Sequence, residues 1–122
     1  MEDFNLIVKE LISKETEVRI PETLIPKLEE TAENYLKKEQ IIDAIKVFIL
    51  TKNKKKLITL GKKAIEETKL EVAFLALKNT ENLEEINNLA NAFMKQNQLK
   101  LALECFKLAQ NKEMIEFLVE NF

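Results

Sequence analysis

The chain has 122 residues, of which 46% are hydrophobic and 33% are charged, and its net charge is −2 at pH 7. This length suits one domain with a hydrophobic core, and the near-balanced charge gives no general attraction to nucleic acids or anionic membranes. One glycine and two prolines are too few for the tight turns of a hairpin-rich sheet, so the composition favours an all-α fold.

Residues that carry chemistry are scarce. The chain has no histidine and a single cysteine, Cys105. Histidine is the commonest general base and metal ligand, and one cysteine forms neither an intrachain disulfide nor a cysteine-based zinc site. We therefore expect no enzymatic activity, no metal and no cofactor, with a Glu- or Lys-based enzyme as the minor alternative, and we expect Cys105 to be a small core residue.

The first residues, MEDFNLIVKELISK, are acidic and amphipathic. A secretory signal instead begins with a basic segment and continues with an unbroken apolar run. No stretch of the sequence approaches the roughly 18 apolar residues of a membrane span. We therefore expect a cytoplasmic protein without membrane partners.

Apolar residues recur with the period of a buried helical stripe and predict eight helices within a single domain over residues 1–122. A lone N-terminal helix near 3–14 comes first, and a connection through Arg19 leads to Pro21. Pro21 and Pro26 suit the entry and first turn of the next helix, where a missing N–H group costs little. The remaining elements are helical hairpins near 22–51, 54–80 and 83–109, and a C-terminal helix over 112–122.

The three hairpins share a period of 29 residues, which separates Ala44, Ala73 and Ala102. The same period aligns Phe48, Leu77 and Phe106 four residues later, and Ala32, Gly61 and Ala90 in the preceding helices. A part of a fourth unit continues it with Ile115, Leu118, Val119 and Phe122. We expect the aromatic residues in these columns to lie in the core, namely Tyr35, Phe48, Phe74, Phe93 and Phe106.

Asparagine precedes a helix at the same position of each unit, at Asn53, Asn82 and Asn111. An asparagine side chain at this position accepts a hydrogen bond from an unpaired N–H group of the first turn. Glu85 follows Asn82 at the spacing of a capping box. Thr68 and Glu71 have the same spacing at the turn inside the second hairpin, so we expect a cap there too.

The third unit reads Ile86-x2-Leu89-Ala90-x2-Phe93-x8-Ala102-x3-Phe106-x2-Ala109 and resembles the tetratricopeptide repeat. Its period is 29 instead of about 34 residues, and it lacks the proline near the end of the unit. Residues 70–106 are also similar to the helical solenoids of coatomer and the clathrin heavy chain. The resemblance covers residues 22–122 and implies a right-handed superhelix of antiparallel hairpins, whose first helices line a concave groove that binds peptides or helices. It places no catalytic residue.

The resemblance assigns this groove to one face of the first helices. In the second hairpin that face carries Lys55, Ile58, Lys62, Ile65 and Glu66, and in the third it carries Glu84, Asn87, Asn91, Met94 and Lys95. Asn87 and Asn91 are four residues apart and share a helical face, so they are either amides for a peptide backbone or ordinary solvated residues. The candidate partner-binding residues are Lys55, Lys62, Asn87, Asn91, Met94 and Lys95.

Lysines crowd the start of the second hairpin, from Lys52 to Lys56 and at Lys62 and Lys63. Cations in the first turn of a helix oppose the helix dipole, and nothing in the sequence compensates for them. They are either ordinary surface lysines or a docking point for an acidic ligand. Because aromatic residues and arginine are absent from this stretch, we do not expect nucleic-acid binding.

The final helix has no following hairpin to cover Phe117 and Phe122, so these residues are candidates for an end interface with a second copy or a docked partner. The leading hypothesis for the whole chain is a protein–protein interaction module, an adaptor or scaffold that binds a peptide or protein on the concave face. The alternative is a structural protein that assembles into homo-oligomers, including homodimers, through the exposed ends.

Overall fold

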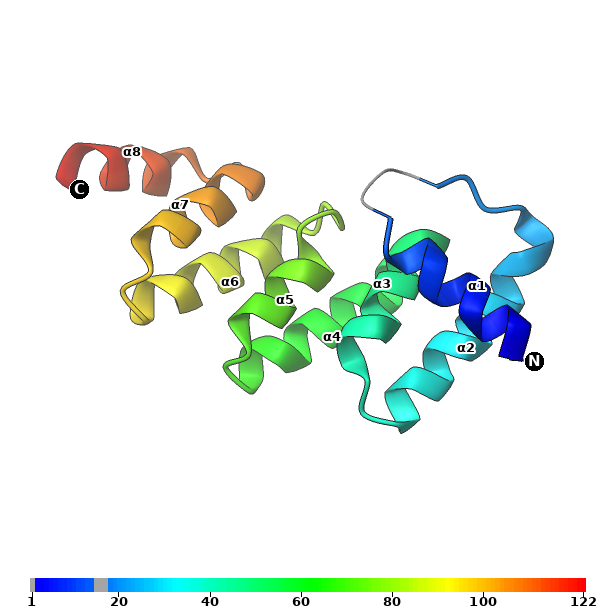
Figure 1. Ribbon diagram of the computed structural model, residues 1–122. Helices are drawn as coiled ribbons and strands as arrows, with labels where there is room; N and C mark the ends of the chain where they lie inside the picture. Colours follow the sequence, from blue (N-terminus) through cyan, green and yellow to red (C-terminus); the bar gives the residue numbers. More distant parts are fainter. Residues whose placement is uncertain (1, 15–17) are drawn as a thin grey trace. The chain divides into compact units, whose positions relative to one another are not determined.

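The computed structural model describes residues 2–14 and 18–122, and the regular structure of these residues is entirely helical (Figure 1). This confirms the predicted all-α class. The helices lie within a few residues of the predicted segments. They are α1 (Glu2–Ile12), the short 3-10 helix η1 (Glu22–Leu24), α2 (Ile25–Lys37), α3 (Ile41–Thr51), α4 (Lys54–Glu66), α5 (Leu70–Leu77), α6 (Leu83–Lys95), α7 (Leu99–Leu108) and α8 (Lys112–Asn121).

The chain divides into two compact units, Met1–Lys56 and Leu57–Phe122. In the first unit α2 packs against α3, and α1 packs against α3 as well. Val8 of α1 is fully buried, and the Nζ atom of Lys27 lies 4.5 Å from the centre of the Phe4 ring, which ties α1 to α2. The single domain expected over residues 1–122 stays a prediction.

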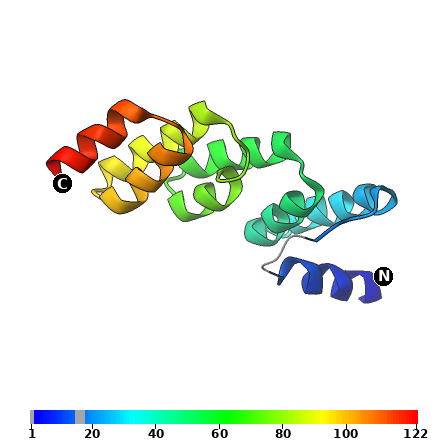
Figure 2. The same ribbon diagram turned by 90° about the horizontal axis from the view of Figure 1, so that it is seen from above.

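The second unit has one hydrophobic core to which α4, α5, α6, α7 and α8 all contribute. Helices α6 and α7 lie side by side as an antiparallel pair, and α8 packs next to α7 (Figures 1 and 2). At Gly61, α4 and α5 lie so close together that an added Cβ atom would overlap the Cγ and Cδ2 atoms of Leu77 in α5. A residue larger than glycine would therefore displace the Leu77 side chain at this position.

The backbone repeats with the same 29-residue period as the side chains. Glu39, Thr68 and Asn97, at the turns inside the hairpins, have φ of 61°, 57° and 59°. Lys52, Glu81 and Gln110, at the turns between hairpins, have φ of 57°, 61° and 58°. All six are left-handed positions that usually favour glycine, so the helix ends of each unit are built alike. The six residues supply independent support for a helical repeat.

Hydrogen bonds at these turns repeat as well. The backbone N–H group of residue 40, 69 or 98 donates to the carbonyl five residues earlier, with N···O distances of 2.8, 2.8 and 2.9 Å. This is the six-to-one bond of a Schellman ending, which satisfies a carbonyl that the helix leaves open. The two helices of each hairpin are therefore joined by the same tight turn.

Two local predictions are wrong. Thr68 does not cap α5, because it occupies the left-handed position of the turn and its hydroxyl donates to the Glu67 carbonyl at 2.6 Å. Helix α5 begins after Lys69, which makes no side-chain cap. Phe74 is only half-buried, and the Nζ atom of Lys78 lies 5.9 Å from its ring centre. The other four aromatic residues, which occupy two repeat columns, are buried as expected; they are Tyr35, Phe48, Phe93 and Phe106.

Candidate functional site

The asparagine caps form as predicted. The Oδ1 atoms of Asn53, Asn82 and Asn111 each accept a hydrogen bond from the backbone N–H group three residues later, at 3.1, 3.0 and 3.2 Å. The capping box at Asn82 is only half formed, because the N–H group of Asn82 donates to Thr80 Oγ1 at 3.3 Å. The Glu85 carboxylate, which a complete capping box would bond to the N–H group of Asn82, instead pairs with Lys62.

Two of the capping asparagines also bond to the preceding first helix. The Nδ2 atom of Asn53 donates to Glu29 Oε2 in α2 at 2.7 Å, and that of Asn111 donates to Asn87 Oδ1 in α6 at 2.7 Å. Glu29 and Asn87 occupy the same repeat column. The corresponding residue for Asn82 is Ile58, which has no acceptor. The spacing of the caps does not indicate this contact, although two of the three residues in the column, Glu29 and Asn87, have side chains that accept hydrogen bonds.

Ion pairs occupy a second pair of repeat columns. The Nζ atom of Lys56 in α4 lies 2.9 Å from Glu33 Oε1 in α2. The Nζ atom of Lys62 in α4 lies 3.7 Å from Glu85 Oε2 in α6. Lys62 corresponds to Glu33 and Glu85 to Lys56, so the same geometry recurs with the charges exchanged. Only 13% of the Glu85 side chain is exposed, which makes this the better shielded of the two pairs.

The lysine-rich turn has an ion pair that the sequence did not reveal, besides the predicted cap. Lys56 is paired with Glu33, and Asn53 caps the first turn of α4. Lys54 and Lys55 are exposed and engaged in contacts of their own. These contacts offset part of the unfavourable interaction between the lysines and the helix dipole, and binding of an acidic ligand at this turn stays a prediction.

The predicted groove residues lie on α4 and α6. Lys55, Asn91 and Lys95 are exposed, and Met94 is partly buried against the core. Lys62 and Asn87 help to hold the first helices together, because Lys62 joins α4 to α6 and Asn87 joins α6 to α8. We define the first-helix face as Lys62, Asn91, Met94 and Lys95. Binding of a partner to this face stays a prediction.

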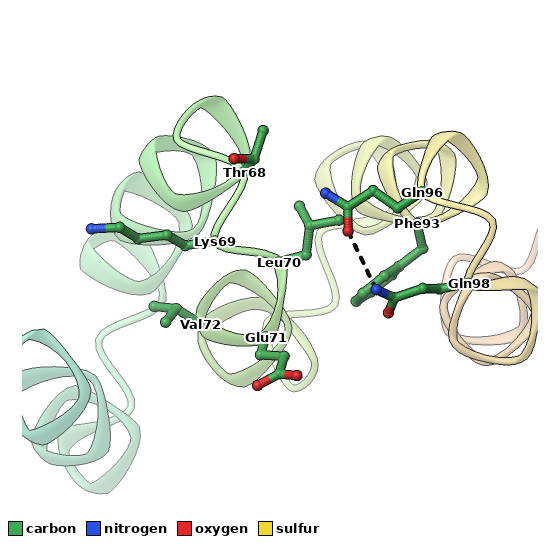
Figure 3. Close-up of a pocket in the computed structure, with 8 residues that line it drawn as sticks. All are labelled: Thr68, Lys69, Leu70, Glu71, Val72, Phe93, Gln96 and Gln98. Atoms are coloured by element: carbon green, nitrogen blue, oxygen red, sulfur yellow. Dashed lines mark hydrogen bonds between the residues drawn. The ribbon is translucent and has the colours of Figure 1, made fainter.

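A shallow depression lies beside the turns of two successive hairpins (Figure 3). It has a volume of about 310 Å³. Leu70 and Phe93 are almost fully buried at its base, and the amides of Gln96 and Gln98 bond to each other at 3.3 Å on one side (Figure 3). Its polar lining consists of Thr68, Lys69, Glu71, Gln96 and Gln98, and the Lys69 ammonium lies 3.4 Å from Glu67.

A second depression, of about 550 Å³, lies in the first unit. It is lined by the start of α2, the end of α3 and the connection before η1. Arg19 and Lys52 give it a cationic rim, and Ile25 and Leu50 give it apolar walls. No pattern in the sequence indicates this depression.

Apolar side chains are exposed on α8. The exposed fractions are 46% for Phe117, 64% for Val119 and 76% for Phe122. The rings of Phe117 and Phe122 meet edge to face with centroids 6.4 Å apart. We define the end surface as Phe117, Val119 and Phe122. The exposure expected for Phe117 and Phe122 is confirmed, and a role in assembly stays a prediction.

Two titratable side chains of the core have raised pKa values, Cys105 and Tyr35. Cys105 is fully buried, and burial, with the charge of Glu104 as a second cause, raises the pKa of its thiol to about 12. The Tyr35 hydroxyl is buried without a hydrogen-bond partner; burial first and the Asp43 charge second raise its pKa. Among the described residues no three His, Cys, Asp or Glu side chains gather in a way that holds a metal ion.

Helices long and apolar enough to cross a membrane do not occur in residues 2–14 and 18–122. Comparisons of the chain with protein-family profiles, curated proteins and solved structures found no match. The proposal for its function therefore rests on the contacts and exposed surfaces described above.

Proposed function

We propose that this chain is a protein–protein interaction module, an adaptor or scaffold, that binds a peptide or protein segment along the first-helix face. In this proposal the hairpins stack into a right-handed superhelix similar to that of tetratricopeptide repeats, and the module acts in the cytoplasm.

The observation that carries the proposal is the regular linkage of successive first helices. The Lys62–Glu85 contact joins α4 to α6, and the Asn87–Asn111 contact joins α6 to the start of α8. Repeats that bury their apolar stripes against their neighbours present a continuous, pre-organised surface, and such surfaces bind peptides and proteins. Pre-organisation favours binding because little side-chain and loop ordering is then needed on association.

The chemistry of the face suits a peptide with apolar and acidic side chains. Met94 supplies an adaptable apolar contact, Asn91 supplies both a donor and an acceptor for a peptide backbone, and Lys95 supplies positive charge, whereas the charge of Lys62 is paired with Glu85. Asn91 and Lys95 are exposed and lie four residues apart on α6, so one ligand can contact both.

A peptide-display selection against the immobilised chain tests the proposal. Recovered peptides should bind the unaltered chain in a saturable manner. Their affinity for a Met94→Glu/Lys95→Glu variant should be at least about tenfold lower, because the variant loses the apolar contact at residue 94 and has the opposite charge at residue 95. Lys107→Glu in α7 is the matched control, since Lys107 is exposed but belongs to a second helix. Recovery of no peptide, or equal binding to the double variant, would refute the proposal.

A further inference from the structure

Helix α8 carries three carboxylates on one exposed face. Glu113, Glu116 and Glu120 are exposed and are spaced three and four residues apart, so they are neighbours on the helix surface. Within residues 2–14 and 18–122, none of the three forms an ion pair. Like charges at these spacings repel one another, and α8 has no basic residue in its last turn, where a cation would suit the helix dipole. We define these three residues as the acidic stripe.

The charge of the exposed face changes from one first helix to the next. Lys62 in α4, Asn91 in α6 and Glu120 in α8 follow one another at intervals of 29 residues, and all three are exposed. The same repeat column therefore carries a cation, an amide and a carboxylate in turn. Because the Lys62 ammonium is paired with Glu85 at 3.7 Å, the cation that faces the acidic stripe from α6 is Lys95, which is exposed one turn after Asn91.

We infer that the ligand of the first-helix face continues onto the acidic stripe, and that it is a peptide in which an acidic and a basic side chain lie three or four residues apart. The acidic side chain contacts Lys95, and the basic one lies between Glu116 and Glu120. Neighbouring helices lie about 8–10 Å apart and an extended peptide advances about 3.3 Å per residue, which sets this separation. The inference rests on the proposed function and specifies the partner of the same face.

A lysine or arginine side chain is the complement that fits the stripe. Glu113 and Glu120 are seven residues apart, about 10 Å along a helix, so one metal ion cannot bridge the stripe. The Cβ atoms of residues four apart, such as Glu116 and Glu120, are about 5–6 Å from each other, and the fork of an arginine can reach both carboxylates. The hydrogen bond from Asn111 to Asn87 joins α6 to the start of α8 before any ligand binds, so the ligand meets a pre-organised surface.

Peptides recovered by display against the immobilised chain test the inference. They should share an acidic and a basic residue three or four positions apart. Replacement of the basic residue by glutamate should lower the affinity at least about tenfold, and so should Glu116→Lys/Glu120→Lys in the chain. The altered peptide and the altered chain together should recover part of this loss, because the glutamate then faces lysines. The affinity of the unaltered pair should fall as salt is raised.

A matched variant and a stability measurement separate recognition from bulk charge and from folding. Glu10→Lys/Glu104→Lys changes the net charge by the same amount at exposed carboxylates of α1 and α7, and it should leave the affinity unchanged. Glu116→Lys/Glu120→Lys should unfold at the same or a higher temperature than the unaltered chain, because it removes the repulsion and suits the helix dipole. Loss of affinity in a chain that is no less stable cannot be due to unfolding.

The inference would be overturned by peptides that lack the charge pattern or that bind Glu116→Lys/Glu120→Lys and the unaltered chain equally well. If Met94→Glu/Lys95→Glu still weakens those peptides, the proposed function stands without the inference, whereas recovery of no peptide would refute both. An equal loss of affinity in the matched variant, or a lower unfolding temperature of Glu116→Lys/Glu120→Lys, would also overturn it. A concentration-dependent dimer in sedimentation that Glu116→Lys/Glu120→Lys dissolves would assign the acidic stripe to a second copy of the chain instead.

Discussion

The ammonium of Lys56 pairs with Glu33 at 2.9 Å, and one repeat later Lys62 and Glu85 form the same contact with the charges exchanged, at 3.7 Å. At the same repeat position, the first helices of neighbouring hairpins are therefore joined by an ion pair, and either helix can supply the cation. The 29-residue period of the sequence thus corresponds to a contact between neighbouring hairpins.

The interchange predicts the result of a charge swap. Glu85→Lys alone should lower the free energy of unfolding by about 0.5–1 kcal/mol, because it places two ammonium groups together and a cation in the first turn of α6. The double variant Lys62→Glu/Glu85→Lys should recover a part of this loss. Urea unfolding followed by circular dichroism measures both. A double variant no more stable than Glu85→Lys would show that the two side chains are not coupled.

The asparagine caps predict a contrast between two identical substitutions. Asn82→Asp should be neutral or slightly stabilising, because aspartate caps as well as asparagine and suits the positive end of the helix. Asn111→Asp should destabilise the chain by about 1 kcal/mol, because it replaces the amide that donates to Asn87 Oδ1 with an acceptor. Thermal unfolding of both variants at pH 7 checks this, and equal effects would argue against the contact with Asn87.

The left-handed turns predict a stabilising glycine. Thr68 is a β-branched residue at φ 57°, a conformation that costs an L-residue about 1–2 kcal/mol and glycine almost nothing. Thr68→Gly should therefore raise the free energy of unfolding by about 0.5–1 kcal/mol. Lys63→Gly, within α4, serves as the control and should lower it by about 1 kcal/mol. A loss of stability in Thr68→Gly would contradict the assigned turn.

The burial of Cys105 predicts that the stability of the chain depends on pH. Its pKa is raised from 9.0 to about 12 in the folded chain, so the folded state keeps a proton that the unfolded state releases above pH 9. The contribution of the protonated thiol to the free energy of unfolding is fully present below pH 9 and is lost as pH rises toward 12. The stability advantage of the unaltered chain over Cys105→Ala should therefore shrink between pH 8 and pH 10.5 in urea unfolding. An advantage that is constant or grows over this interval would contradict the burial of the thiol.

Much of the fold is predictable from the sequence because the period is encoded several times over. The alanine column, the aromatic column and the asparagine caps are all set by short-range rules, so the helices and the turns between them follow from spacing alone. The wrong cap at Thr68 has a local cause. Its spacing to Glu71 is right for a cap, but the turn is so tight that Thr68 takes the left-handed position and Lys69 precedes the helix.

The contacts between hairpins are harder to predict because they depend on how far one helix is shifted along its neighbour. That shift brings Lys62 to Glu85 and Asn111 to Asn87, and no short-range rule specifies it. The sequence holds a signal nevertheless, since Glu33 and Lys56 have the same separation as Lys62 and Glu85, with opposite charges. The hydrogen bond from Asn111 occupies the Oδ1 atom of Asn87, one of the two asparagines that are either amides for a peptide backbone or ordinary solvated residues.

The central claim is that the first-helix face binds a peptide. The most direct test is a titration of the isotopically labelled chain with a display-selected peptide, followed by amide chemical shifts in NMR. The account predicts saturable shifts that are largest at Asn91, Met94 and Lys95 and extend to Lys62. Saturable binding with the largest shifts on α7, α8 or the depression beside Gln96 and Gln98 would contradict it.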